Sequence, residues 1–141
     1  MYTPPQFAEQ DQARIAAFIR ANDFGLLVSR SPAGLAASHL PFLFDEPGGR
    51  LFAHVARAND QWRDIGAAGP VLVVFSGPHG YVSPRWYETQ PAVPTWNYEA
   101  VHVTGRARAV HEPAALREIV DGLSRVYEAG VPRPWSIDGV P

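Results

Sequence analysis

The chain has no cysteine among its 141 residues, and this absence excludes several kinds of chemistry. Disulfide bonds, a thiolate nucleophile and zinc sites with thiolate ligands all require a thiol. No apolar run approaches the roughly 20 residues that a membrane-spanning helix needs. The N-terminus also lacks a basic segment followed by a long apolar run, so we expect no signal peptide. The default expectation is a cytoplasmic protein without a membrane partner.

The chain also has no strong excess of charge of one sign. Lys and Arg number 12 against 14 Asp and Glu, which gives a formal net charge of −2, and the pI is about 6.2. Neither a basic patch nor a helix-turn-helix pattern is visible, so charge and motif do not support direct DNA binding. Hydrophobic residues make up 46% of the chain and charged residues 18%, which is a globular composition. We expect a single domain over residues 1–141.

Most of the predicted elements are strands joined by short connections. The predicted strands are Phe24–Ser29, Leu35–Phe44, Leu51–Ala56, Val71–Phe75 and Asn97–Val110. Amphipathic helices are predicted at 11–21, with Asp11 as N-cap, and at 112–129. One or two helical turns are predicted at Asn59–Ile65. The pattern predicts a mainly β fold with flanking helices, built as a small closed or split β-barrel.

The first candidate site is Ala56-Arg57-Ala58-Asn59, between a predicted strand and a predicted short helix. Asn59 suits an N-cap, and exposed backbone N–H groups beside an Arg side chain can bind phosphate. Asp60 lies in the same turn and would repel an anion unless it points away. The plainer alternative is a capped surface helix with a solvated Arg57, which the residues alone favour.

The second candidate is Ser38-His39-Leu40-Pro41, inside a predicted strand. Pro41 removes a ladder hydrogen bond, which suits a sheet edge or a bulge. A core histidine bonded to a backbone carbonyl is the plainer alternative to a functional His39. The five histidines of the chain are scattered without the i, i+4 spacing of a metal-binding helix, so we predict no metal site. No motif identifies a catalytic residue.

The third candidate is the segment 77–105, which we expect to be mostly loop. It holds two of the four tryptophans, three of the five tyrosines and four prolines. Aromatic side chains bury a large area, and prolines hold a loop in one shape before anything binds. The segment could form a subunit interface, a stacking surface for a flat aromatic ligand, or a connection packed over its own barrel. Residue patterns do not separate these three.

Consecutive motifs along nearly the whole chain match one family. They are Met1-Tyr2-x-Pro4 with Phe7, Ser38-His39-Leu40-Pro41, His54-x-Ala56-Arg57-Ala58-Asn59-x-Gln61-Trp62, Gly77-Pro78-His79-x-Tyr81-Val82-Ser83-Pro84-x-Trp86-Tyr87, and Val93-Pro94-Thr95-Trp96-Asn97-Tyr98-x-x-Val101-His102-Val103-x-Gly105. On these motifs the chain resembles the PaiB-like family of FMN-binding negative transcriptional regulators. That family is part of the split-barrel flavoproteins related to pyridoxamine phosphate oxidase.

The resemblance implies an FMN-binding split β-barrel and a homodimer with FMN at each subunit interface. It implies that the aromatic segment crosses to the partner subunit, and it strengthens the phosphate interpretation of Arg57. The cofactor-binding residues that it implies are Ser38, His39, Leu40, His54, Arg57, Asn59, Gln61, Trp62, Trp96 and Asn97. Family members continue beyond the part that matches Pro134-Trp135, so a chain ending at Pro141 is either shortened or part of a longer product.

Three functions remain open from the sequence. The first is an FMN-dependent oxidoreductase or flavin-dependent sensor, and the second is the transcriptional repressor that the family name implies. DNA as a partner follows only from that family label. The third is a related split barrel that binds haem, in which His39 or His102 would ligate the iron.

Overall fold

The structure is a computed structural model that describes residues 1–66 and 69–139. Its centre is an antiparallel sheet of four strands in the order β2-β1-β5-β6. These strands are β1 (Phe24–Ser31), β2 (Gly34–Pro41), β5 (Val71–Val82) and β6 (Thr95–Gly105). A separate hairpin contains β3 (Leu43–Asp45) and β4 (Arg50–Phe52). The predicted mainly β fold is confirmed, and the sheet is split rather than closed.

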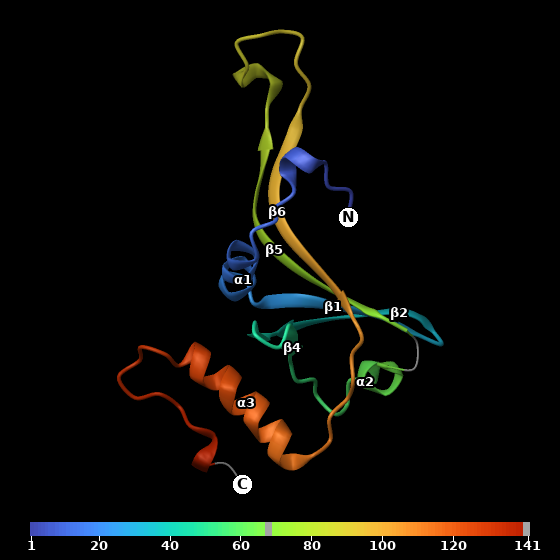
Figure 1. Cartoon of the computed structure of the whole chain (residues 1–141), viewed down its shortest axis with the longest axis vertical. Coiled ribbons are helices and arrows are strands. Elements are labelled where there is room, and N and C mark those ends of the chain that lie inside the picture. The colour runs from blue at the N-terminus through green and yellow to red at the C-terminus, as the bar shows by residue number, and fades with distance from the viewer. Residues whose placement is uncertain (67–68, 140–141) are drawn as a thin grey trace.

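Helices flank the sheet, as predicted. They are α1 (Gln12–Ala21), α2 (Gln61–Asp64) and α3 (Pro113–Tyr127), with 3-10 turns at Pro5–Phe7, Pro84–Trp86 and Ile137–Gly139. The carboxylate of Asp11 accepts hydrogen bonds from the backbone N–H groups of Ala13 and Arg14, which confirms the predicted N-cap. Figure 1 shows α1 beside the base of β5 and β6, and α3 beyond the β3–β4 hairpin. None of the described helices has the length and apolar character needed to cross a membrane.

The hydrophobic core covers one face of the sheet. Its buried residues are Ile19, Leu27, Leu40, Phe42, Val71, Val73 and Phe75. Phe75 is fully buried, and its ring meets that of Phe42 edge to face at 5.5 Å. A Cβ added to Gly25 would lie 2.9 Å from Cε1 of Phe75. A glycine at position 25 therefore lets the Phe75 ring lie directly against β1.

The predicted strand Leu35–Phe44 is wrong in one respect, because it is interrupted. Its pairing with β1 ends at Pro41, and β3 begins two residues later at Leu43. Between them the backbone N–H of Phe42 donates to the carbonyl oxygen of Asp23 at 2.9 Å. Because hydrogen-bonded and non-hydrogen-bonded pairs alternate along an antiparallel ladder, this bond places the nitrogen of Pro41 on the outer edge of β2, where proline provides no N–H. The predicted strand Leu51–Ala56 is also too long, since β4 ends at Phe52.

The expectation that segment 77–105 is mostly loop is wrong. The two strands β5 and β6 pair from base to tip, with one register irregularity between Ser76 and His79. Figure 1 shows them as a long arm that extends well away from the other strands. The predicted extension of the last strand through 106–110 is also wrong, because β6 ends at Gly105. Those residues instead run from the sheet towards α3.

Helix α3 contacts the start of β1 through a hydrogen bond between the side chains of Tyr127 and Asp23. Partial burial raises the pKa of Tyr127 to about 12, and a hydrogen bond to the Asp23 side chain adds to this effect. Nearer its middle the helix buries Leu123 and passes close to the β3–β4 hairpin. There, a Cβ added to Gly122 would lie 2.7 Å from Cδ1 of Leu43. These contacts hold α3 against the hairpin.

The contact between Gly25 and Phe75 gives the first prediction. Gly25→Ala should lower the midpoint of thermal unfolding, because the added methyl group overlaps a ring that has no free space around it. Overpacking of this kind typically costs about 1–3 kcal/mol. Gly80→Ala is the matched control, since its Cβ would meet nothing within 4 Å. Circular dichroism melting curves that coincide for the two variants would contradict this packing.

Candidate functional site

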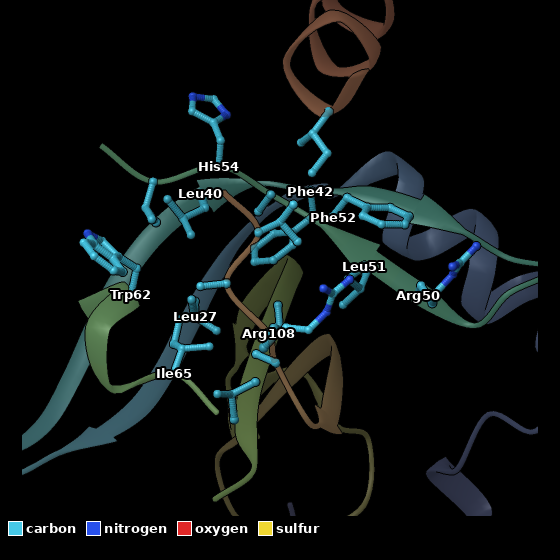
Figure 2. A pocket seen from close by; sticks show the side chains of 18 of the residues that line it. Leu27, Leu40, Phe42, Arg50, Leu51, Phe52, His54, Trp62, Ile65 and Arg108 are labelled. Carbon is cyan, nitrogen blue, oxygen red and sulfur yellow. The ribbon is translucent and has the colours of Figure 1, made fainter. Parts of the chain in front are cut away.

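A pocket of about 670 Å³ lies between the core face of the sheet, the β3–β4 hairpin and α3 (Figure 2). Its walls are mostly apolar and include Leu27, Leu40, Phe42, Val71, Val73, Val103, Leu116 and Ile119. Residues with cationic or imidazole side chains are also part of its lining, namely Arg50, Arg57, Arg106, Arg108, His54 and His111. No acidic side chain is among the described residues that line it. Its volume falls in the range of about 300–1,000 Å³ that is usual for small-molecule sites.

The exposed Arg57 lies in the loop of residues 55–60, called the Arg57 loop below. The backbone N–H of Asn59 donates to the carbonyl of Ala56 at 2.9 Å and closes the turn. The indole Nε1 of Trp62 donates to the carbonyl of Arg57 at 3.0 Å. Within the described residues the guanidinium of Arg57 makes no ion pair. It is therefore available to bind an anion.

The predicted helix start at Asn59 is wrong, because α2 begins at Gln61 and has only four residues. Asn59 still accepts a hydrogen bond through Oδ1 from the backbone N–H of Gln61, at 3.1 Å. A helix this short gives little dipole, so anion binding here rests on Arg57 and the loop. Asp60, which could repel an anion, pairs with Arg63 at 3.2 Å.

Two amide side chains attach the Arg57 loop to the sheet. The Nδ2 of Asn59 donates to Oγ of Ser38 on β2 at 2.9 Å. The Nε2 of the buried Gln61 lies 2.9 Å from Oγ of Ser29 and 3.3 Å from the carbonyl oxygens of Leu27 and Ala36. Gln61 thus bridges β1 and β2, and its buried Oε1 has no hydrogen-bond partner in the described structure. Nothing in the residue pattern signalled this bridge.

The other candidates on β2 face in two directions. Leu40 is buried in the pocket wall, whereas the His39 ring stacks on that of Phe24 with centroids 6.0 Å apart. In the described part of the chain, β2 pairs only with β1 and so forms an edge of the sheet. The backbone groups along its outer edge are therefore open to a ligand.

Trp62 and His54 both line the edge of the pocket. The ring of Trp62 meets that of His111 edge to face at 5.2 Å, and the Arg63 guanidinium lies 5.5 Å from its centroid. Figure 2 shows His54 directed away from the pocket. Sequence reasoning missed His111, which comes near Trp62 only because the chain after β6 passes α2.

Trp96 and Asn97 lie on the β5–β6 arm, apart from the other candidates. They pair with Tyr81 and Gly80, and the Trp96 ring also lies 6.3 Å from that of His79. The Trp96 side chain is 59% exposed in the single chain. In Figure 1 the arm and α2 are at opposite ends of the sheet. A single chain therefore does not bring Trp96 to its own Arg57 loop.

Comparison with known proteins gives a family match over the whole chain, residues 1–141, to the model described as "Putative FMN-binding domain". The Bacillus subtilis "Protease synthase and sporulation protein PAI 2" is 37% identical over 130 residues, which are 91% of this chain and 62% of that protein. An uncharacterized Aspergillus fumigatus protein is 31% identical over 100% of this chain and 74% of its own length. The chain thus spans less than two thirds of the Bacillus protein.

The bridge made by Gln61 gives the second prediction. Gln61→Leu should lower the free energy of unfolding by about 1–3 kcal/mol, because buried acceptors on β1 and β2 lose their donor. Gln90→Leu is the matched control. The amide of Gln90 also donates to two carbonyl oxygens, but at an exposed position where water can replace it. In urea titrations, equal shifts of the two midpoints would show that Gln61 does not hold the strands.

Proposed function

Because the chain belongs to the family of FMN-binding domains, we propose that it is a flavin-dependent redox protein that works as a homodimer. In this proposal the Arg57 loop and the outer edge of β2 hold FMN. The observation that carries it is the Arg57 loop, which is hydrogen-bonded to the edge strand β2 and lines an apolar pocket, and whose Arg57 makes no ion pair in the described structure. The binding test is direct: the purified protein should retain one FMN per chain, identified by absorbance and by the mass of the released cofactor.

The donor set fits the chemistry of FMN. Arg57 can bind a phosphate through two parallel hydrogen bonds, and the loop contributes backbone N–H groups. The outer edge of β2 can match the alternating donors and acceptors on the rim of a flavin ring. The bound flavin supplies the electron transfer, while the protein residues bind it and orient it. Ser38 and Asn59, which hydrogen-bond to each other, keep the phosphate end and the ring end in fixed relation.

Exposed aromatic side chains support the homodimer. On the arm, the exposed fractions are 49% for Tyr81, 59% for Trp96 and 58% for Tyr98. At the start of β1, Phe24 is 64% exposed. Apolar patches of this kind usually mark interfaces, and a twofold axis would let the arm of one subunit reach the Arg57 loop of the other. The proposal therefore requires the partner's Trp96 and Asn97 to complete each flavin site.

Redox chemistry is preferred here over direct repression of transcription. The repressor role rests on the name of the resembled family, and a net charge of −2 does not favour contact with DNA phosphates. The family match names FMN and gives the haem alternative no support. A mobility-shift experiment tests this preference: DNA binding by the FMN-loaded protein at physiological salt would contradict it.

The third prediction concerns the phosphate. Arg57→Ala should weaken FMN binding by about 1.5–3 kcal/mol, which is roughly ten- to a hundredfold. Riboflavin lacks the phosphate, so its affinity should barely change. Arg14→Ala is the control, because Arg14 is exposed on α1 and pairs with Glu9. Flavin fluorescence titrations measure all of these affinities, and equal losses for FMN and riboflavin would remove Arg57 from the phosphate site.

The fourth prediction concerns the arm. Trp96→Ala should weaken dimerisation and FMN binding together, since a buried tryptophan cut to alanine typically costs about 3–5 kcal/mol. Trp135→Ala is the control, because the two residues are similarly exposed in the single chain, at 59% and 51%. Sedimentation equilibrium and flavin fluorescence on the same samples measure both effects. If the Trp96 variant stays dimeric with unchanged FMN affinity, the arm does not contribute to the site.

A further inference from the structure

The interior of the pocket has a chemistry that the flavin site does not use. Four of the flavin candidates, Leu40, His54, Arg57 and Trp62, line part of the pocket, and Figure 2 shows Trp62 at its edge. Behind them the walls include side chains of the hydrophobic core, among them Leu27, Val71 and Val73. The volume of about 670 Å³ is far larger than the ~30 Å³ that one water molecule occupies in the liquid. Water finds few hydrogen-bond partners on such walls, so an apolar body fits this space better.

The charged side chains among the described residues that line the pocket are all arginines, and so all positive. Arg50 is already committed to Asp45, with an N–O distance of 2.7 Å. Arg106 and Arg108 make no ion pair within the described residues. Figure 2 shows the Arg108 guanidinium inside the pocket beside Leu51, whereas Arg50 points outward.

Glu112 is an acidic residue close enough to Arg108 to feel its charge. Backbone hydrogen bonds lower the pKa of Glu112, and the charge of Arg108 adds to this effect. Glu112 does not line the pocket, and it makes no ion pair with Arg108 in the described structure. The positive charge of Arg108 therefore remains available on the pocket side.

The backbone after β6 explains how these cations reach an apolar space. The chain leaves the sheet at Gly105 and crosses the pocket on its way to α3. Along this crossing Ala107 and Ala109 are half-buried, whereas Arg106 and Arg108 are exposed. The crossing segment thus places small apolar residues on the wall and brings the guanidinium group of Arg108 into the pocket.

We propose that this pocket binds an amphiphilic anion. An apolar body lies against the core face of the sheet, and a carboxylate or phosphate head is bound by Arg108 with Arg106 beside it. Guanidinium groups bind both kinds of head through paired hydrogen bonds. The residues that bind the head differ from the flavin candidates, although Leu40, His54, Arg57 and Trp62 line the same pocket.

Titration calorimetry on the full chain loaded with FMN tests the proposal. The probes share one alkyl chain and differ in the head: decanoate, decyl phosphate, decanol and decyltrimethylammonium. At least one of the two anions should bind saturably, with one molecule per chain. Its affinity should be at least about tenfold higher than that of decanol, and decyltrimethylammonium should not bind. The stronger of the two anions identifies the head group that the pocket prefers.

The variants separate the charge from the apolar walls. Arg108→Gln should weaken binding of the anion by roughly ten- to a hundredfold and leave decanol unchanged, whereas Arg108→Lys should retain most of the affinity. Arg125→Gln is the control, because Arg125 lies on α3 outside the pocket and pairs with Asp121. Ala109→Phe fills part of the space and should block the anion and decanol alike, even if the Arg108 variants fold poorly.

Three results would overturn the proposal. The first is that neither anion binds saturably. The second is equal affinity for decanoate and decanol that Arg108→Gln does not change. The third is release of FMN by decanoate, which would show that the pocket belongs to the flavin. FMN retention is measured by absorbance in every titration, so a failure of the anion site and a failure of flavin binding give different signals.

Discussion

The break in the chain between β2 and β3 is the feature on which both candidate sites depend. Pairing with β1 ends at Pro41, apart from one further bond from the N–H of Phe42 to Asp23, and the chain then forms the β3–β4 hairpin outside the main sheet. The separation leaves the outer edge of β2 without a neighbouring strand in the described structure. It also leaves the space between hairpin and sheet that α3 covers. A continuous strand through this region would close both openings.

The Arg57 loop shows how a short irregular segment can be as well positioned as a strand. Its side-chain hydrogen bonds end on β1 and β2, through Ser38 and the bridge made by Gln61. Sites attached to regular elements in this way keep their geometry before a ligand arrives, which reduces the entropy lost on binding. The loop also needs no helix dipole, since α2 is too short to supply one.

The sequence predicted best what depends on neighbouring residues. The cap at Asp11, the two long helices and the strand Phe24–Ser29 follow from local patterns, and the structure confirms them. The arm was mistaken for loop because prolines and aromatics are dense there, although most of the prolines lie in the tip between the strands. The alternation of apolar and polar residues through 106–110 arises because one side of this segment is buried beside the pocket, and not because the segment pairs with another strand. Gln61 and His111 act through partners far away in the sequence, so no local pattern reveals them.

The structure of the arm also affects how readily its backbone hydrogen bonds open. Only Leu72, Val73 and Val74 of β5 pair with β1, so most of the ribbon formed by β5 and β6 has no third strand. Two-stranded ribbons are marginal on their own in water, and such regions open locally well before the whole domain unfolds. The backbone amides of the arm therefore exchange hydrogen with solvent according to what covers its aromatic face. Their exchange rates therefore report how much of the arm is covered when the subunits assemble.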